Sequence, residues 1–382
     1  MRLIAVAGSV AQRPGNGGHA WVFLQYLLGL RLLGYQPLFI DCLTAEMALG
    51  ADGRPSRPAR DRGIEWLRRL MGEFGFEDSY ILLLDDRRSV GIDRSEALQR
   101  VRDAALLLNV TGFLADEQML AAASRRVFLD IDPGFPQMWR ELGQADILAG
   151  HDDFVTFAQN IGAAGCRIPT CGLPWITTRP PVVLEHWPRA PGGSRFTSIG
   201  AWRGPYDPVE YHGDRYGLRA HEFRRFAELP PITGASFEVA LDIAPADRND
   251  IELLERNSWK LVEPRAVAGD PDSYRAYIQA SAAEFMVAKN MYVKTHSGWF
   301  SDRSVCYLAS GKPVLAQDTG LSGDLSSQEG LLTFTDLDEA ARAVAELERD
   351  PVTHERAARA VAERHFDART VLARLLEELE VR

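Results

Sequence analysis

The sequence predicts an α/β fold with two Rossmann-like, doubly wound parallel-sheet domains that face a central cleft. Short apolar runs alternate with helical patterns in both halves of the chain, and a proline- and glycine-rich stretch separates the halves. Such alternation gives parallel sheets with right-handed crossovers. The 382 residues are enough for two domains of this kind. Ligands of these sheets bind at the carboxyl ends of the strands, so we expect the site in the cleft.

The first half opens with a βαβ pattern. An apolar strand at 2–8 leads into the glycine-rich loop 14–18, and a helix over 19–33 connects it to a second strand at 37–43. Further strands are predicted at 80–86, 104–112 and 126–132, with helices at 64–74, 95–103 and 116–123, and residues 146–151 and 166–172 are predicted to be later strands or turns.

A linker divides the chain. Residues 177–195 hold four prolines and the pair Gly192–Gly193, a composition typical of linkers. We therefore expect a first domain over 1–180, a linker over 181–195 and a second domain over 196–360. In the second domain, strands are predicted at 196–202, 236–243, 259–264, 291–295, 313–317 and 331–335, and helices at 218–228, 247–256, 272–287 and 301–310. The chain from 337 onward is predicted to be helical.

Composition excludes several classes of protein. The net charge of -10 gives no global basic field for nucleic acid, and no run of about 18 apolar residues predicts a membrane-spanning helix. The four cysteines have neither metal-ligand spacing nor the pattern of a disulfide framework, which predicts a reducing cytoplasm. His151, Asp152 and Asp153, interpreted as the end of a strand, are adjacent, so their side chains point apart. We expect no metal site.

The segment 294–320 carries the strongest chemical signal. Small and polar residues, among them Ser297 and Gly298, come between an apolar run and the helix predicted at 301–310. A glycine admits close backbone approach and a helix N-terminus offers free N–H groups, which together suit a diphosphate. Lys294 and Arg303 could neutralise its charge. After the helix, the strand at 313–317 ends at Asp318, whose carboxylate suits sugar hydroxyls.

This segment resembles the nucleotide-sugar-dependent glycosyltransferases of the GT-B type. His296-Ser-Gly298-Trp-Phe-Ser301 is similar to their donor loop, and Ala309-Ser-Gly311-Lys-Pro313-Val to the turn and strand that follow it. The resemblance implies a GT-B-like fold, with terminal helices over 361–382 that pack back on the first domain. It also implies transfer of a sugar from a nucleoside diphosphate-sugar to a small-molecule or glycan acceptor, without a bound cofactor. The donor contacts it implies are Gly17, Gly18, Arg203, Lys294, His296, Ser297, Gly298, Trp299, Ser301, Asp302, Arg303, Asp318 and Thr319.

Two residues of the first domain are candidates for the general base. His19 begins the first helix, and a neutral imidazole can take the proton of an acceptor hydroxyl; packing at a helix start is the alternative. Asp130 and Asp132 share one side of the strand that ends there, and Pro133 breaks it. Asp132 could orient His19 or act as the base itself, or it could form a turn before the proline. We favour Asp132, because a strand end is better fixed than a glycine loop.

The sequence also departs from the family pattern. The Glu-x7-Glu pair of the retaining branch falls on Gly298 and Cys306, and the glutamate of the inverting branch falls on Ser304. Asp302 or Asp318 could substitute. Two other functions are therefore kept open: a nucleotide-sugar epimerase that uses Asp132 and Asp302 as acid and base, and a non-catalytic nucleotide- or sugar-binding protein.

Overall fold

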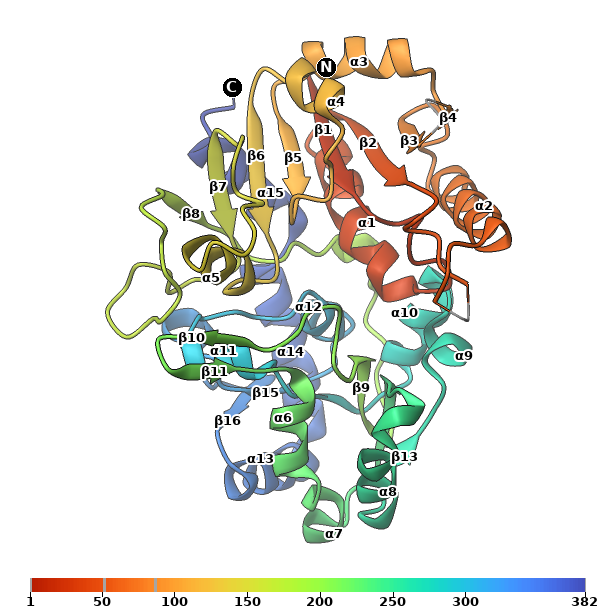
Figure 1. Cartoon of the computed structure of the whole chain (residues 1–382). Coiled ribbons are helices and arrows are strands. Elements are labelled where there is room, and N and C mark those ends of the chain that lie inside the picture. The colour runs from red at the N-terminus through yellow and green to blue at the C-terminus, as the bar shows by residue number, and fades with distance from the viewer. Residues whose placement is uncertain (1, 51–52, 86–87, 382) are drawn as a thin grey trace.

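A computed structural model of the chain describes residues 2–50, 53–85 and 88–381. Its strands form two large sheets and one short hairpin. Figure 1 shows the two sheets in separate units, stacked one above the other. Among the described residues, no helix combines the length and the apolar character needed to cross a membrane.

The first sheet has eight strands in the order β4-β3-β2-β1-β5-β6-β7-β8. All neighbouring strands are parallel except β4, which is antiparallel to β3. The strands are β1 (Leu3–Gly8), β2 (Gln36–Leu43), β3 (Tyr80–Leu84), β4 (Ser89–Gly91), β5 (Leu107–Val110), β6 (Arg126–Asp130), β7 (Asp153–Thr156) and β8 (Trp175–Thr177). Its helices are α1 (Gly17–Leu32), α2 (Arg57–Glu73), α3 (Arg94–Asp103), α4 (Glu117–Ala122) and α5 (Phe135–Glu141). Reversal of the strand order at β1 makes the sheet doubly wound.

The second sheet has six parallel strands in the order β13-β12-β9-β14-β15-β16, which reverses at β9. The strands are β9 (Phe196–Ala201), β12 (Phe237–Asp242), β13 (Lys260–Leu261), β14 (Ala283–Met286), β15 (Val314–Gln317) and β16 (Leu331–Phe334), and the separate hairpin is β10 (Val209–Tyr211) with β11 (Asp214–Tyr216). Its helices are α6 (Arg219–Phe223), α7 (Leu229–Thr233), α8 (Arg248–Arg256), α9 (Pro264–Ala268), α10 (Pro271–Gln279), α11 (Asn290–Thr295), α12 (Asp302–Ala309), α13 (Leu337–Arg349) and α14 (Pro351–His365). Two doubly wound parallel sheets confirm the predicted fold class.

The chain crosses between the units twice, and the two crossings lie side by side. Residues 178–195 join β8 to β9, and Val182 pairs in parallel with Asp367, between α14 and the last helix, α15 (Ala368–Glu378). The first crossing is packed rather than loose, since Trp187 is fully buried against Trp21 with ring centroids 5.0 Å apart. α15 then packs against α1, where Gly29 leaves room for Leu372.

The helix α1 lies between the two units. It is apolar on all sides, as expected of a helix that is covered on every face. It contacts the first sheet, α15 and α10. Figure 1 shows β5, β6 and β7 pointing their carboxyl ends toward the second unit. We call the contact region between the units the seam.

Some predicted elements differ in the structure. Residues 291–295 are the helix α11 rather than a strand, and the helix predicted over 272–287 ends at Gln279, because 283–286 form β14. Short apolar runs do not distinguish strand from helix, and here pairing with β9 and β15 decides. No strand forms at 146–151, so residues 151–153 precede or begin β7 instead of ending a strand. Residue 86 of the strand predicted at 80–86 lies outside the described residues.

Candidate active site

An ion pair joins the two sheet edges at the seam. Asp132 follows β6 and Lys289 follows β14, and the Lys289 Nζ lies 2.5 Å from the Asp132 Oδ1. The side chains are only 23% and 13% exposed, so the pair is substantially shielded from solvent. Asn290 fixes this end of α11, because its side-chain amide accepts from the Gly217 N–H and donates to Glu222.

Aromatic rings surround the Lys289 ammonium. Its Nζ lies 5.3 Å from the ring centroid of Phe135, 5.7 Å from that of Tyr206 and 5.4 Å from that of Tyr292. Phe135 comes from the first unit and the two tyrosines from the second. Cations are attracted to ring faces at such distances. The rings therefore hold the ammonium in place on the seam.

A buried carboxylate positions the loop that carries Asp132. Asp130 has no exposed surface and accepts three hydrogen bonds, from the Gln137 side chain, the Thr156 hydroxyl and the Asp132 backbone N–H. Gln137 also accepts from the Gly134 N–H, which ties the loop to the start of α5. Burial raises the pKa of Asp130 to about 7, although the bonds from Gln137 and Thr156 lower it.

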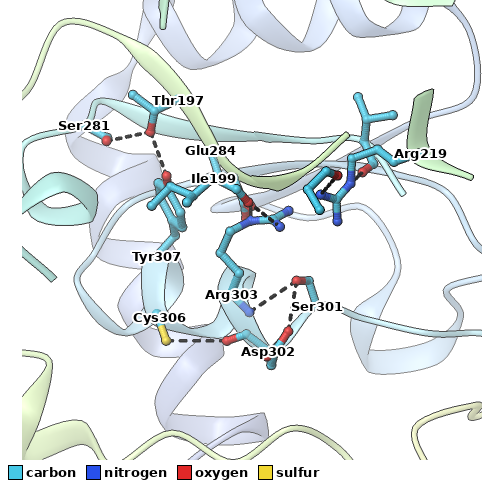
Figure 2. A network of polar contacts seen from close by, with 12 residues as sticks. Thr197, Ile199, Arg219, Ser281, Glu284, Ser301, Asp302, Arg303, Cys306 and Tyr307 are labelled. Carbon is cyan, nitrogen blue, oxygen red and sulfur yellow. Dashed lines mark hydrogen bonds and ion pairs between the residues drawn. The ribbon is translucent and has the colours of Figure 1, made fainter. Parts of the chain in front are cut away.

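Two buried arginines lie at the carboxyl edge of the second sheet (Figure 2). Arg303, in the first turn of α12, donates to the Glu284 Oε1 at 2.5 Å and to the Ile199 carbonyl at 2.8 Å. Arg219, at the start of α6, donates to the Val287 and Ala201 carbonyls.

Arg219 retains donor capacity. Among the described residues, its Nη2 has no hydrogen-bond partner. Burial and the charge of Arg303 lower the pKa of Arg219 to about 9, which still leaves the guanidinium charged at neutral pH. Asp132 and Asp302 exert the opposite, weaker effect on that pKa. An anion at the seam would therefore meet an incompletely paired guanidinium here.

The glycine loop before α1 contacts the second unit directly. A Cβ on Gly17 would lie 2.0 Å from the Asp270 carbonyl oxygen, and one on Gly18 would lie 2.7 Å from the Tyr274 ring. Both glycines thus serve close helix packing between the units. His19 is held by the Ser9 carbonyl at 3.0 Å, and burial, with the charge of Arg13, lowers its pKa to about 4.

The predicted donor loop, 296–301, lies on the seam and contacts the first unit. Trp299 donates from its Nε1 to the Ile131 carbonyl at 3.1 Å and stacks on Tyr292 with centroids 4.2 Å apart. The Asn160 side chain donates to the carbonyls of His296 and Gly320.

Several polar groups of this loop form hydrogen bonds within the loop or with the neighbouring Thr319. Ser297 accepts from the Trp299 N–H, the Gly298 N–H donates to the Thr319 carbonyl, and the Thr319 hydroxyl donates to the Trp299 carbonyl. Ser301 caps α12 by accepting from the Arg303 N–H.

Other predicted contacts have partners of their own. Lys294 is exposed and donates to the Arg215 carbonyl in the β10–β11 hairpin. Arg203 forms a two-point ion pair with Asp247. Asp318 accepts from the N–H groups of the turn that follows it.

Asp302 lines a cavity of about 10 Å³ with Gln25, Tyr26 and Cys306, which is room for about one water. Burial, together with the charge of Asp132, raises the pKa of Asp302, although Arg303 lowers it. Tyr26 is 1% exposed, and its hydroxyl has no partner among the described residues. Cys306 lies next to α1 in this cavity, and a Cβ on Gly298 would be 3.0 Å from the Asn160 side chain.

Sequence reasoning missed Lys289 and Arg219. Lys289 directly follows the apolar run 285–288, and Arg219 is the first residue of α6, so both positions could have been noted from the sequence. Among the described residues, no three His, Cys, Asp or Glu side chains are grouped so as to hold a metal ion.

Comparisons with solved structures identify proteins of similar fold. The chain is similar to an alpha-glucosyltransferase in complex with UDP and a 13-mer DNA, with a TM-score of 0.59 and 12% identity over 100% of both chains. Anabaena Alr3699/HepE, in complex with UDP and glucose, gives 0.58 and 12% over 99% of both chains. A TarM variant from S. aureus, in complex with fondaparinux, alpha-GlcNAc-glycerol and UDP, gives 0.57 and 9% over 99% of both chains.

No protein-family model and no curated protein matches the chain. At these identities the structural likeness concerns the fold alone. The chain has the GT-B fold, as the resemblance implied.

Proposed function

We propose that this protein transfers a sugar from a nucleoside diphosphate-sugar to an acceptor hydroxyl. The observation that carries the proposal is the meeting of Asp132 with Lys289 at the seam, where the carboxyl edges of two doubly wound sheets face each other. Doubly wound sheets bind ligands at this edge. The three solved structures named above were determined with UDP, which supports a nucleotide donor.

The donor diphosphate is assigned to Arg219, Lys289 and the N-terminus of α12. Arg219 has a spare N–H donor, and the ammonium of Lys289 has one carboxylate partner among the described residues. Charge on the leaving diphosphate grows as the bond from the sugar carbon to the phosphate oxygen breaks. Fixed cations and a helix N-terminus stabilise that charge. The proposal therefore requires no metal ion, and we expect turnover to persist in EDTA.

Asp132 is assigned as the general base in preference to His19. A base must come within hydrogen-bond reach of the acceptor hydroxyl, and the Asp132 Oδ2 makes no hydrogen bond to the described residues. His19 has a pKa of about 4 and its Nε2 is engaged by Ser9, which makes it the weaker candidate at neutral pH.

A second candidate is a non-catalytic nucleotide- or sugar-binding protein. Gly298 and Cys306 stand where the retaining branch carries its glutamates, and Gly17 packs directly on Asp270, which leaves little space between α1 and α10. Donor binding would then occur without turnover.

The test is a nucleotide-release assay with UDP-, dTDP-, GDP- and ADP-sugars, run with and without a library of small-molecule and glycan acceptors. Nucleoside diphosphate released only with an acceptor supports transfer. Sugar interconversion without release would instead identify an epimerase, and tight binding without any turnover would identify the binding protein. The variant Asp214→Asn, which breaks a solvent-exposed ion pair across the seam with Arg167, is the matched control and should keep wild-type turnover.

A further inference from the structure

The Asp132–Lys289 pair differs from another ion pair that crosses the seam. Arg167 and Asp214, 2.9 Å apart, leave 56% and 49% of their side chains exposed, whereas Asp132 and Lys289 are 23% and 13% exposed. Exposed pairs contribute little to stability, whereas removing one partner of a shielded pair is costly because it leaves an uncompensated charge. The Asp132–Lys289 pair is therefore an energetically relevant contact between the units.

Both members of the pair also have unused capacity. An ammonium has three N–H donors, and within the described residues the Lys289 Nζ gives only one of them to a hydrogen bond, with Asp132. Its other neighbours are the rings of Phe135, Tyr206 and Tyr292, which attract charge but accept no strong hydrogen bond. A ligand with more negative charge than one carboxylate could thus take the ammonium without breaking any other hydrogen bond.

The two assigned roles conflict while the pair is closed. Lys289 occupies the Asp132 Oδ1, and Asp132 takes an N–H of the ammonium that a phosphate would otherwise receive. We propose that the Asp132–Lys289 ion pair is a latch that the donor's diphosphate opens: the phosphate oxygens take Lys289 from Asp132, and the freed carboxylate then receives the acceptor hydroxyl.

This inference rests on the proposed function and adds to it the order in which the two substrates bind. Donor binding comes first, because the diphosphate frees the Asp132 Oδ1 that Lys289 otherwise holds. The ammonium sits at the end of a flexible four-carbon chain and can turn toward the phosphates while the backbone of α11 stays fixed by Asn290.

The latch predicts that removing the Asp132 charge increases the affinity for phosphate ligands. Asp132 competes with the ligand for Lys289, so Asp132→Asn should bind UDP and inorganic pyrophosphate more tightly than the wild type, by about 5–10-fold. Lys289→Gln should bind both more weakly, by about 10–100-fold, since it loses a charge-assisted bond. In the double variant Asp132→Asn/Lys289→Gln, the Asp132 substitution should bring no gain in affinity. A carboxylate that only supported the fold would leave affinity unchanged or lowered.

The experiment is isothermal titration calorimetry of the full chain with UDP and with pyrophosphate, which has no base or sugar and so isolates the phosphate contact. Asp214→Asn is the matched control and should bind like the wild type, because it breaks a pair across the seam away from Lys289. Thermal melts verify folding, and Asp132→Ser serves as a second variant should the asparagine variant not fold.

The outcomes separate the two claims. If the wild type binds UDP but the Asp132 variants bind it no more tightly, or if they gain equally without Lys289, the latch is wrong while the proposed function stands. If neither wild type nor variants bind any nucleoside diphosphate or pyrophosphate, the proposed function fails, and the latch with it.

Discussion

Gly17 lies directly against Asp270 across the seam, so closely that a Cβ on Gly17 would be 2.0 Å from the Asp270 carbonyl oxygen. The neighbouring Trp21 donates from its Nε1 to the Pro271 carbonyl at 3.0 Å. The start of α1 and the start of α10 therefore meet backbone to backbone. Gly17, the first residue of α1, therefore allows the two units to pack closely together.

Replacing Gly17 with alanine should loosen this contact. The added methyl meets a backbone atom rather than a movable side chain, so we expect a loss of about 1–3 kcal/mol in the free energy of unfolding, measured by urea denaturation. Gly72→Ala is the control, because a Cβ there meets nothing within 4 Å and alanine is the better helix former. Equal stability of Gly17→Ala and wild type would contradict the close contact between the two helices.

Arg219 should matter more for the donor than Arg203. Arg219→Met removes a guanidinium that has a spare donor, so UDP should bind about 10–100-fold more weakly by calorimetry. Arg203→Ala removes a side chain that is paired with Asp247, and its affinity should stay within a few-fold of wild type. A larger loss in Arg203→Ala than in Arg219→Met would return the diphosphate to the position that the sequence alone indicated.

Asp132→Asn should lose turnover although it binds the donor at least as tightly as the wild type. Removal of a general base costs about 10²–10⁴ in turnover. Steady-state rates with a donor and acceptor identified by the release assay measure this, with Asp214→Asn as control. His19→Gln, measured beside it, decides between the two candidates. Full turnover in Asp132→Asn with a large loss in His19→Gln would move the base to His19.

The stability of the fold should fall as pH rises toward 7. Burial raises the pKa of Asp130 and of Asp41 to about 7, and both side chains have no exposed surface. Each carboxyl is then protonated in the folded state and ionised in the unfolded state between about pH 4 and 7. The folded state binds the extra proton, so each group lowers the free energy of unfolding by about 1.4 kcal/mol per pH unit in this window.

Urea denaturation at pH 5, 6 and 7 tests this dependence. Asp130→Asn and Asp41→Asn should each reduce the slope, and the double variant should reduce it further. A wild-type stability that rises across this range, with the variants parallel to it, would show that both carboxyls are ionised in the folded protein.

Much of the fold could be predicted from the sequence because its signals are local. Apolar runs bounded by glycine and proline marked most strands of both sheets, and alternation with helices implied parallel order. The same reasoning placed Asp132 at a strand end, where ligands of such sheets bind. It also identified the loop 296–301, which lies on the seam.

The residues that contact Asp132 could not be predicted from the local sequence. The apolar runs 285–288 and 291–293 are both short, and only the pairing of β14 with β9 and β15 shows that the strand includes part of the first. Interpreting the second run as the strand led to Lys294 as the candidate phosphate cation, whereas the structure places Lys289 beside Asp132.

Similarly, the β10–β11 hairpin separates β9 from α6, so the cation next to the strand end is Arg203, while Arg219 is the one buried at the sheet edge. The sequence by itself determined the two parallel sheets and the edge at which a site forms, because periodicity and strand ends are properties of neighbouring residues. The tertiary structure alone decided which charges meet there, because Asp132 and Lys289 are brought together by the packing of two units from distant parts of the chain.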